Sequence, residues 1–414
     1  MIKLTRAQEN ALDYKKNILV EAGAGSGKTS LFVERYFRIL FENPSIHPKQ
    51  ILALTFTKKA ASECLVRIYN KFQDYSDKLD NFENRITALD EANISTIHRF
   101  CSTLLKENAL QINLSPQFNV LTEHESVFIF KTAVNTLISQ LSAKFDPDLK
   151  FYISTHSENK LIRDLLICYQ KRDIILNSSY SQKALTPISV SLHSLFSKTM
   201  GIYTQLKEVQ FGIDYSDLIQ KTLFLLNIKS IRSLLQKRYQ YIMIDECQDI
   251  DPMQWEIITA LCEGNNHLKN KKLFLVGDPK QCIYRFRGAD LNFFYSLSNE
   301  FLKTKDLCKV VSLDNNFRSS PAILQTLNPI FEHVFENSTD QKTPFTALNA
   351  KKTFSGNVEF AFLKDVNNEN DEFNFIYTWI LSNKLIEKTD KTTAILTRER
   401  NQSENLFKFL KSKG

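Results

Sequence analysis

The chain has 414 residues, of which 43% are hydrophobic and 24% charged, an ordinary composition for a folded globular protein of two or three domains. It carries 53 basic and 46 acidic side chains, and the net charge of +7 only mildly favours a polyanionic partner. No apolar run approaches the ~20 residues of a membrane span, and the N-terminus lacks a signal-peptide core, so we expect a cytoplasmic protein with no membrane partner. The seven scattered cysteines, without CxxC pairs, predict reduced core thiols.

The first predicted elements are a strand, a glycine-rich loop and a helix. Asn17 to Val20 (NILV) is a short apolar run typical of a buried strand, and Lys28 to Leu40 carries apolar residues at helical spacing. Glycines at positions 23, 25 and 27 of the loop allow positive φ and a close approach of the backbone to a ligand. Successive N–H groups of such a loop can converge on phosphate oxygens at the N-terminus of the helix.

The sequence EAGAGSGKT, residues 21–29, fits a phosphate-binding P-loop, although Ala22 stands where the usual pattern has its first glycine. In such a loop Lys28 reaches the β- and γ-phosphates, and Thr29 binds Mg²⁺. The alternative is a glycine-rich turn that binds nothing. The residues expected to line the nucleotide are Ala22, Gly23, Ala24, Gly25, Ser26, Gly27, Lys28, Thr29 and Ser30.

Further along the chain, apolar runs typical of strands alternate with helical patterns. The runs are Ile51 to Phe56, Tyr241 to Ile244, Leu273 to Val276 and Val310 to Leu313. This alternation predicts an α/β fold with a parallel sheet. Between about residues 110 and 215 such runs are few and helix formers are many, which predicts an inserted helical subdomain. Near the C-terminus we expect a polar loop at 365–371, a helix at 375–386 and a strand at 393–397.

Two carboxylates follow the apolar run of YIMIDECQD. A buried strand that ends in Asp245 and Glu246 presents them at the carboxyl edge of a doubly wound sheet, where such folds bind ligands. Asp245 would hold Mg²⁺ and Glu246 would polarise an attacking water, as phosphoryl transfer to water requires. A solvated acidic strand end is the alternative. We expect the pair and the glycine loop to meet across neighbouring strands around one metal-bound triphosphate.

Two more polar segments follow predicted strands. In LFLVGDPKQCIYRFRGAD, Gln281 can sense a γ-phosphate through its amide, and the aromatic residues interleaved with arginine suit stacking on nucleic-acid bases. One loop could then couple ATP to DNA. In VVSLDNNFRSS, Arg318 lies just beyond a strand, and an arginine from a second domain can neutralise transition-state charge.

Together these segments resemble superfamily 1 DNA helicases of the UvrD/RecB type, in order and over essentially the whole chain. LTRAQENAL resembles the Q motif of that family, EAGAGSGKT motif I, LTFTKKAA motif Ia and STIHRFC motif Ib. IDYSDLI matches a further family element, DECQD motif II, GDPKQCIYRFRGAD motif III and NNFRSS motif IV. AILTRERNQSENLFKFLKSKG resembles the next segment of the second motor domain. The amino-acid sequences of motifs Ib and III are more similar to those of the RecB/AddA branch than to those of UvrD or PcrA.

The resemblance implies roles for individual residues. It places Gln8 and Phe317 on either side of adenine. The implied catalytic residues are Lys28, Asp245, Glu246, Gln281 and Arg318, with Gln281 and Arg318 at the γ-phosphate and Thr29 and Asp245 on the metal. The implied DNA contacts are Phe56, Thr57, His98, Tyr284, Phe286 and Arg287. For each aromatic residue, and for Phe56 on its strand end in particular, packing in the core is the alternative.

The resemblance also implies a domain plan and an activity. Residues 1–110 and 213–305 would form a RecA-like P-loop motor domain, residues 111–212 its helical insertion, and residues 306–414 the beginning of a second RecA-like domain. Hydrolysis of ATP with Mg²⁺ would drive 3′ to 5′ movement on single-stranded DNA and at duplex junctions, in repair and recombination. A RecC- or AddB-like subunit is the partner that the RecB/AddA branch implies.

No segment resembles motifs V and VI or the nuclease domain of RecB and AddA. We therefore expect the amino-terminal part of a helicase. Its ATP site would lack the residues that motifs V and VI supply, so it would hydrolyse ATP weakly or not at all. A non-catalytic ATP- and DNA-binding fragment is the alternative, and the intact set of catalytic residues argues against long decay. A P-loop kinase or GTPase lacks support, because motifs Ia, III and IV have no purpose there.

Overall fold

The structure is a computed structural model that describes residues 4–78, 82–172, 175, 186–262, 272–285, 288–337, 345–364, 368–383 and 392–413. The chain divides into two compact units, Met1–Phe354 and Ser355–Gly414, and each is described by itself. In the part of the chain that the structure describes, no helix is both long and apolar enough to cross a membrane.

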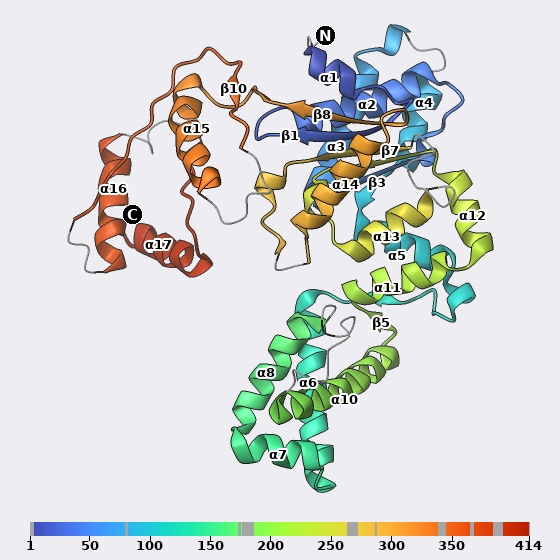
Figure 1. The fold of residues 1–414 in the computed structure, drawn as a ribbon, viewed down its shortest axis with the longest axis vertical. Helices are drawn as coiled ribbons and strands as arrows, with labels where there is room; N and C mark the ends of the chain where they lie inside the picture. Colours follow the sequence, from blue (N-terminus) through green and yellow to red (C-terminus); the bar gives the residue numbers. More distant parts are fainter. Residues whose placement is uncertain are drawn as a thin grey trace. The chain divides into compact units, whose positions relative to one another are not determined.

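Six parallel strands form the central sheet of the first unit, in the order β3-β2-β6-β7-β1-β8 (Figure 1). They are β1 (Asn17–Ala22), β2 (Ile51–Thr55), β3 (Asn93–Thr96), β6 (Tyr241–Ile244), β7 (Leu273–Gly277) and β8 (Cys308–Leu313). Every residue of β2 and β7 is buried, as expected of strands that are covered on both faces. The predicted α/β fold with a parallel sheet is confirmed.

The helices of this unit, outside the insertion, connect the strands. They are α1 (Arg6–Ala11), α2 (Lys28–Glu42), α3 (Lys58–Gln73), α4 (Phe82–Ala88), α5 (Ile97–Glu107), α11 (Tyr215–Leu226), α12 (Lys229–Arg238), α13 (Pro252–Leu261), α14 (Leu291–Lys303) and α15 (Pro321–Glu336). Short 3₁₀ turns are η1 (Pro48–Gln50), η2 (Ser76–Lys78), η3 (Leu89–Glu91), η4 (Ala109–Ile112), η6 (Cys247–Asp249) and η7 (Pro279–Gln281). Thr57 and Thr96 start α3 and α5 as N-caps, each accepting a backbone N–H bond through its hydroxyl.

Helices cover both faces of the sheet, because successive strand residues point to opposite sides. In β1, Leu19 packs in one core with residues of α5, α11, α13 and α14. Its neighbours Ile18 and Val20 pack in a second core with residues of α2 and α3. The apolar positions of the strands therefore build two cores, and the loops at the ends of the strands stay at the edges of this sandwich.

In the part of the chain that the structure describes, the range predicted as a helical subdomain is helical and has its own core. Its helices are α6 (Glu123–Ala143), α7 (Pro147–Thr155), α8 (Glu158–Gln170) and α10 (Pro187–Val209), and they bury aromatic residues such as Phe130, Phe196 and Tyr203. The chain enters and leaves the insertion through two short paired strands, β4 (Asn119–Val120) and β5 (Gly212–Ile213).

The first unit continues beyond residue 305, where the sequence analysis placed the end of the first motor domain. Strand β8 pairs along its whole length with β1 and forms the edge of the central sheet. After it, β9 (Asn315–Asn316) pairs with β10 (Asn349–Ala350), and α15 lies between them in the sequence. Strand β8 therefore belongs to the same sheet as β1, which leads into the glycine loop, whereas β9 and β10 form a separate two-stranded sheet.

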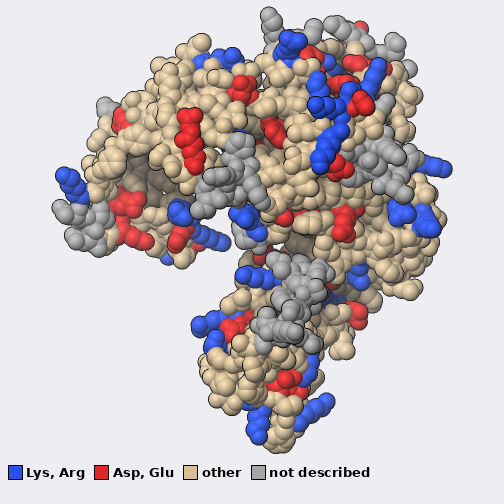
Figure 2. Space-filling view, viewed as in Figure 1, with Lys and Arg blue, Asp and Glu red and all other residues tan. Residues whose placement is uncertain are grey.

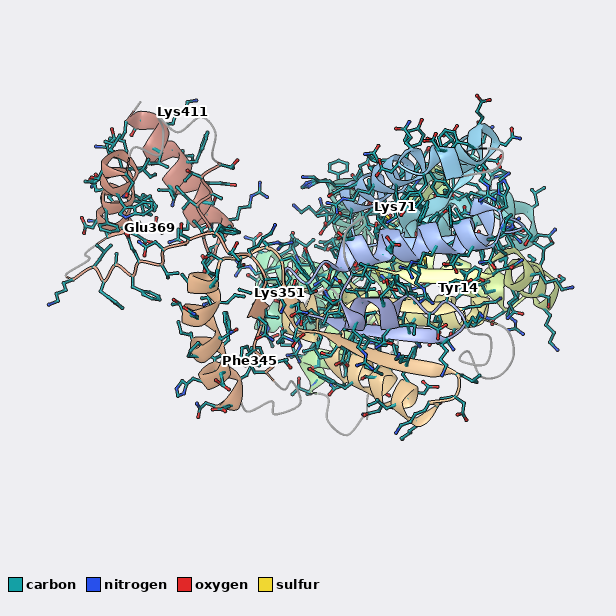
Figure 3. The ribbon with its side chains drawn as sticks, turned by 90° about the horizontal axis from the view of Figure 1, so that it is seen from above. Tyr14, Lys71, Phe345, Lys351, Glu369 and Lys411 are labelled. Carbon is teal, nitrogen blue, oxygen red and sulfur yellow. The ribbon has the colours of Figure 1, made fainter. Side chains whose placement is uncertain are left out.

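The described part of the second unit contains α16 (Glu369–Ser382) and α17 (Arg400–Ser412), which carry the labelled Glu369 and Lys411 in Figure 3. Phe373 and Leu406 are buried in this pair of helices. Helix α16 covers residues 375–382 of the predicted helix at 375–386, of which 384–386 lie outside the described residues. It already begins at Glu369, so the predicted polar loop at 365–371 is wrong for its last three residues. The predicted strand at 393–397 is wrong, since these residues have no regular secondary structure. An apolar run becomes a strand only when a neighbouring strand pairs with it, and none of the described residues does so here.

The cysteines and the surface charges can be compared with what the composition predicts. All seven cysteines are free, and the five at positions 64, 101, 247, 262 and 308 are buried, as predicted, whereas Cys168 and Cys282 are only half-buried. On the face seen in Figure 2, basic and acidic side chains are intermixed. A nucleic-acid site is therefore better sought among specific loops than from net charge.

Candidate nucleotide and DNA site

The carboxyl ends of all six strands in the central sheet carry residues predicted for the site. Because parallel strands end on the same edge, these residues are brought to one side of the sheet. In sheet order they are His98 after β3, Phe56 after β2, Asp245 and Glu246 after β6, Gln281 after β7, Lys28 after β1 and Arg318 after β8. Along this edge His98 and Phe56, which were predicted for DNA, follow β3 and β2, whereas the residues that follow β6, β7, β1 and β8 in this order were predicted for the nucleotide.

The loop between β1 and α2 has the geometry of a phosphate cradle. Gly25 and Gly27 have φ values of 70° and 86°, which residues with a Cβ rarely adopt. Gly27 is the N-cap of α2 and offers no side-chain hydrogen bond to the N–H groups of the first turn, where Thr29 and Ser30 lie. A phosphate at this position would meet those N–H groups and the positive end of the helix dipole.

Lys28 lies beside the acidic pair. Its Nζ is 3.9 Å from Oε2 of Glu246, and it donates a hydrogen bond to the carbonyl oxygen of Ala22, 3.3 Å away. Asp245 is anchored by its N–H group, which donates to the carbonyl of Leu54 in β2 at 2.9 Å. The two segments thus lie close together, but the expectation of neighbouring strands is wrong, because β7 lies between β1 and β6. The long lysine side chain spans the extra strand.

Glu246 is held in an uncommon backbone conformation. Its φ of 54° lies in the left-handed region, which non-glycine residues rarely adopt and which often marks functional sites. Its Oε2 accepts a hydrogen bond from Nε2 of Gln248 at 2.8 Å, and Oε1 of Gln248 accepts one from the N–H of Asp278 at 2.9 Å. The buried Gln248 thereby ties the turn after β6 to the turn after β7. Sequence reasoning missed Gln248, whose only signal was its place inside DECQD.

The carboxylates after β6 repel one another. Burial, followed by repulsion from Glu246, raises the pKa of Asp245 to about 6, although Lys28 acts in the opposite direction. The same causes raise the pKa of Asp249 to about 6, and its Oδ1 is buried without a hydrogen-bond partner. A divalent cation would relieve this repulsion, so the site fits the Mg²⁺ that the sequence resemblance implies.

The protein alone does not surround such a cation. Among the described residues, no group of three or more acidic, histidine or cysteine side chains is placed to hold a metal ion. Mg²⁺ is commonly held by one or two carboxylates and completes its shell with phosphate oxygens and water. Asp245 and the hydroxyl of Thr29 are the groups that would bind it together with a triphosphate.

Gln281 ends the short η7 turn after β7. Its Nε2 donates to Oδ2 of Asp278 at 2.8 Å, and Asp278 is also paired with Nζ of Lys280 at 3.1 Å. Asp278 is buried, so this arrangement fixes the amide of Gln281 at the strand end between β6 and β1. The predicted γ-phosphate sensor therefore lies between the acidic pair and the glycine loop along the edge.

The segment after β8 is bonded to the glycine loop. Nδ2 of Asn316 donates to the carbonyl of Ala24 at 2.7 Å, and the N–H of Phe317 donates to the carbonyl of Gly25 at 2.8 Å. A Cβ on Gly25 would lie 2.8 Å from Cβ of Arg318, so this close approach requires glycine. Phe317 and Arg318, which were predicted for the nucleotide site, thus lie against the glycine loop. Asn316 was not predicted, because its role depends on this tertiary contact.

Gln8, on α1, contacts the same loop. Its Nε2 donates to the carbonyl of Ser26 at 3.3 Å, and its Oε1 accepts from the N–H of Thr5 at 3.0 Å. Thr5 is the N-cap of α1, and Gln8 closes a reciprocal capping box with it. Gln8 and Phe317, which were predicted on either side of adenine, therefore both bind backbone carbonyls of the glycine loop.

Two aromatic pairs lie toward the other end of the edge. The rings of Phe56 and Tyr284 have centroids 4.5 Å apart, although they follow β2 and β7, which are separated by β6. The rings of His98 and Tyr215 are 4.9 Å apart in an edge-to-face arrangement. Tyr215, the first residue of α11, is 42% exposed and was not predicted; the aromatic position in IDYSDLI was its signal.

The remaining predicted DNA contacts differ in their placement. The hydroxyl of Thr57 accepts from the N–H of Ala60 and caps α3, and Thr57 itself is exposed beside Phe56. Phe286 and Arg287 lie outside the described residues. Arg285, immediately before them, is exposed.

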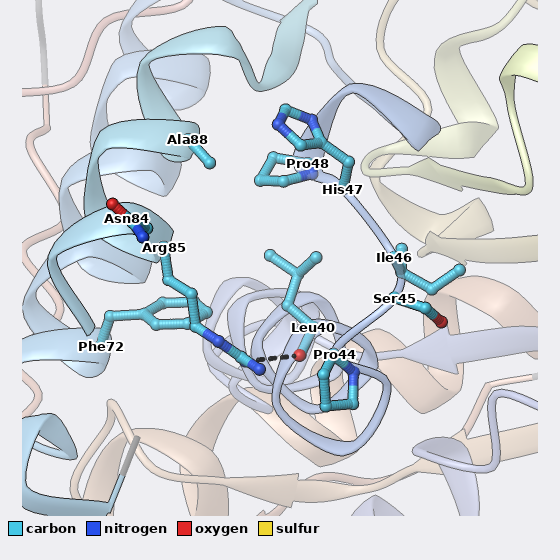
Figure 4. Close-up of a pocket in the computed structure, with 10 residues that line it drawn as sticks. All are labelled: Leu40, Pro44, Ser45, Ile46, His47, Pro48, Phe72, Asn84, Arg85 and Ala88. Carbon is cyan, nitrogen blue, oxygen red and sulfur yellow. Dashed lines mark hydrogen bonds between the residues drawn. The ribbon is translucent and has the colours of Figure 1, made fainter. Parts of the chain in front are cut away.

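A separate pocket of about 190 Å³ lies near the C-terminal end of α2 (Figure 4). Its lining residues are Leu40, Pro44, Ser45, Ile46, His47, Pro48, Phe72, Asn84, Arg85 and Ala88. Arg85 donates to the carbonyl of Leu40 at 3.0 Å. The glycine loop is at the opposite end of the same helix, and the pocket includes none of the predicted site residues.

Comparisons with known proteins identify the family. The sequence model for the UvrD/REP helicase N-terminal domain matches residues 4–302, and that for the UvrD-like helicase C-terminal domain matches residues 311–414. A probable DNA helicase II homolog of Mycoplasma genitalium is 27% identical over 99% of this chain and 54% of its own length. The ATP-dependent DNA helicase PcrA of Staphylococcus aureus is 27% identical over 95% of this chain and 48% of its own length.

The ATP-dependent DNA helicase Rep of Buchnera aphidicola is 28% identical over 80% of this chain and 45% of its own length. The chain thus spans about half the length of these curated relatives. They are of the helicase II, PcrA and Rep types, and the predicted RecB/AddA branch stays a prediction. Since the N-terminal domain model alone matches more than half of the chain, the chain belongs to the UvrD-type family of superfamily 1 helicases.

Proposed function

We propose that this chain forms the ATP-hydrolysing part of a DNA helicase or translocase. The observation that carries the proposal is the position of Lys28, whose Nζ lies 3.9 Å from Glu246 at the carboxyl edge of a parallel sheet. Membership of the family supports it, and so do the names of PcrA and Rep as ATP-dependent DNA helicases.

The glycine loop and the acidic pair would share one nucleotide. The phosphates would take the N–H groups of residues 23–29, and Lys28 would exchange its bond to the Ala22 carbonyl for a phosphate oxygen. Thr29 and Asp245 would hold Mg²⁺, which when bound neutralises phosphate charge. Glu246 would accept the proton of an attacking water, and the hydrogen bond from Gln248 keeps its carboxylate oriented for that task.

Two residues would respond to the γ-phosphate from other strands. The Gln281 amide, fixed by Asp278, lies on the strand end next to the glycine loop. Arg318 is exposed on the segment that is hydrogen-bonded to that loop, so its guanidinium can reach a phosphate without leaving a buried partner. An arginine in this role is worth roughly 10³ to 10⁵ in rate where it has been measured.

Coupling to DNA would run through the segment after β7. Gln281 and Tyr284 are three residues apart on it, and the ring of Tyr284 packs on Phe56. A shift of Gln281 on binding or losing the γ-phosphate would therefore move an aromatic ring at the end of the edge proposed for DNA. Base stacking on such rings contributes about 1 to 3 kcal/mol per base, enough to grip a single strand and still release it.

By resemblance, the motor would move 3′ to 5′ on single-stranded DNA, act at duplex junctions in repair and recombination, and bind a RecC- or AddB-like partner. The amino-acid sequences of motifs Ib and III support the assignment of this chain to the RecB/AddA branch. The domain plan of 1–110 with 213–305, 111–212 and 306–414 is likewise proposed, with β8 added to the first motor domain because it is part of that sheet.

The test is equilibrium binding of Mg·ATP, together with hydrolysis with and without single-stranded DNA. Lys28→Ala should weaken ATP binding roughly 10- to 100-fold, because a charge-assisted bond to phosphate is lost. Lys49→Ala is the matched control, since Lys49 is exposed and pairs with Glu91 away from the site. Unchanged binding in Lys28→Ala would refute the proposal. Binding of ATP and DNA without any hydrolysis would favour the non-catalytic fragment instead.

A further inference from the structure

Arg35 is a buried cation that the proposed hydrolytic site does not use. It lies on α2, the helix that begins at Lys28, and only 1% of its surface is exposed. Burial lowers the pKa of its guanidinium to about 9. None of the described carboxylates forms an ion pair with it. Burying an unpaired charge is costly, so the contacts that Arg35 does make indicate what it is for.

These contacts are to the backbone around α1. Nη1 donates to the carbonyl of Ala11 at 2.9 Å, and Nη2 donates to the carbonyl of Lys16 at 3.3 Å. Ala11 is the last residue of α1, where carbonyl groups lack partners inside the helix and a cation is favoured by the dipole. The guanidinium also lies 4.4 Å from the ring of Phe274 in β7. Arg35 therefore fastens the end of α1 to the sheet.

A second arginine on α2 fastens the outer side of the same short helix. Arg38 makes a bidentate pair with Glu9, with both N–O distances at 2.9 Å. Helix α1 has six residues, too few to be stable in isolation, so its position depends on such contacts. Arg38 binds Glu9, the neighbour of Gln8, and Arg35 binds Ala11 at the end of the same helix. Both arginines therefore hold the helix that carries Gln8.

The Gln8 amide has only one orientation that satisfies its partners. Oε1 faces the N–H of Thr5, which can only donate, and Nε2 faces the carbonyl of Ser26, which can only accept. Oε1 keeps a second lone pair and Nε2 a second hydrogen. Adenine offers a donor at N6 beside an acceptor at N7, whereas guanine offers acceptors at both O6 and N7. An amide held this way matches adenine, and reversing it for guanine would break both backbone bonds.

We propose that Arg35 is a positioning residue for base selection, which holds α1 against the glycine loop so that the Gln8 amide stays in the orientation that accepts adenine and rejects guanine. The inference rests on the proposed function, in which the base of bound ATP faces Gln8. Without Arg35, α1 moves away from Ser26, the amide can turn over, and guanine is accepted.

The experiment is competition of ATP and of GTP, with Mg²⁺, against a fluorescent ribose-labelled ATP on the full chain. Arg35→Met should reduce the ratio of ATP affinity to GTP affinity about tenfold, the effect of one hydrogen bond. Arg35→Lys should keep part of the preference, because an ammonium group can still donate to the carbonyls of Ala11 and Lys16. Arg67→Met is the control, since Arg67 is an exposed arginine paired with Glu63, and its ratio should equal that of the wild type.

Equal loss of affinity for both nucleotides in Arg35→Met would overturn the inference, because a merely structural role does not change the ratio. Should Arg35→Met fail to fold, Arg38→Met and Glu9→Gln loosen α1 from its exposed side. Each should lower the ratio about threefold, and unchanged ratios in both would overturn the inference.

Two further variants separate this inference from the proposed function. Gln8→Ala should abolish most of the ATP preference. An unchanged ratio in Gln8→Ala would mean that Gln8 does not read the base, so the inference falls while nucleotide binding stands. Lys28→Ala with unchanged affinity for both nucleotides would instead remove the proposed function itself.

Discussion

Asn316 donates a hydrogen bond from Nδ2 to the carbonyl of Ala24 across 2.7 Å. Its Oδ1 accepts from the N–H groups of Arg318 and Ser319 at 2.8 and 2.7 Å. One buried side chain thus shapes the turn that carries Arg318 and fixes a peptide of the glycine loop. The conformation of the loop that would receive phosphate therefore depends on a residue from the opposite part of the first unit's sequence.

We predict that Asn316→Ala weakens ATP binding about tenfold, because three hydrogen bonds of about 0.5 to 1.5 kcal/mol each are lost and the glycine loop is no longer held. Titration with Mg·ATP measures the effect. Asn349→Ala is the control, since Asn349 lies on the neighbouring β10, is exposed and bonds to Asp314. An affinity that is unchanged in Asn316→Ala would mean that the loop keeps its conformation without this contact.

Asp245→Asn should stabilise the protein in the absence of metal and nucleotide. Burial and repulsion from Glu246 raise the pKa of Asp245 to about 6 in the folded state. The folded state therefore holds this proton more tightly than the unfolded state does, and stability falls as pH rises from about 4 to about 6. The asparagine carries no charge, so at pH 8 the variant should gain about 1 to 3 kcal/mol in its free energy of unfolding.

Chemical denaturation at pH 4.5 and pH 8 measures this prediction. The gain should be present at pH 8 and largely absent at pH 4.5, where the wild-type carboxyl is protonated. At the same time, Mg·ATP should stabilise the variant much less than the wild type, because a metal ligand is missing. A variant that is less stable than the wild type at pH 8 would contradict the repulsion between Asp245 and Glu246.

Phe56→Ala and Tyr284→Ala should each weaken binding of single-stranded DNA. Loss of one stacked base costs about 1 to 3 kcal/mol, which corresponds to a fall in affinity of roughly 5- to 150-fold. Because the two rings pack on each other, the double variant should lose less than the product of the single losses. Fluorescence anisotropy with a labelled oligonucleotide measures the affinities. Tyr14→Leu is the control, since Tyr14 precedes β1 and lies near the amino ends of the strands, away from the proposed DNA contacts. A similar loss of DNA affinity in Tyr14→Leu would contradict the proposed role of Phe56 and Tyr284.

Much of the sheet could be predicted because its strands are continuous apolar runs. The runs at 51–56, 241–244, 273–276 and 310–313 all became strands with bounds shifted by no more than two residues. Strand β3 (Asn93–Thr96) was not predicted. It lies at the edge of the sheet, is half-buried and contains three polar residues, so it lacks an apolar run. Polar residues directly after apolar runs correctly marked the carboxyl edge.

Contacts between distant segments could not be predicted. The order of the strands decides that β7 separates the glycine loop from the acidic pair, and no local pattern encodes that order. The hydrogen bond from Asn316 to Ala24 and the ring contact between Phe56 and Tyr284 also depend on how loops from different strands meet. A sequence marks which residue types stand at the strand ends, whereas the fold decides which of them touch.

Lys207, in the helical insertion, should contribute more to the free energy of unfolding than a typical surface lysine does. It is buried, and its Nζ lies 3.0 Å from Oδ2 of Asp214 and 2.5 Å from Oδ2 of Asp217. The hydroxyl of Tyr203 donates to the same oxygen of Asp214 at 2.7 Å. Lys207→Met removes the cation that bonds to both carboxylates and leaves Asp214 with the longer contact to Arg172, whose Nη2 lies 3.8 Å from Oδ2. We therefore expect a loss of about 3 to 5 kcal/mol in the free energy of unfolding at pH 7.5.

Lys198→Met on the same helix is the matched control. Lys198 is 38% exposed and pairs with Asp146 and Asp148, so its loss should be below about 1 kcal/mol. Burial acts to raise the pKa of Asp214, but the positive charges of Lys207 and Arg172 keep this pKa below its usual value. The resulting contribution to stability is present at neutral pH and is lost as the pH falls through the pKa of Asp214 in the folded state. The difference between Lys207→Met and the wild type should therefore shrink below about pH 4, as urea denaturation can measure. Equal losses for the two lysine variants at pH 7.5 would contradict the buried network.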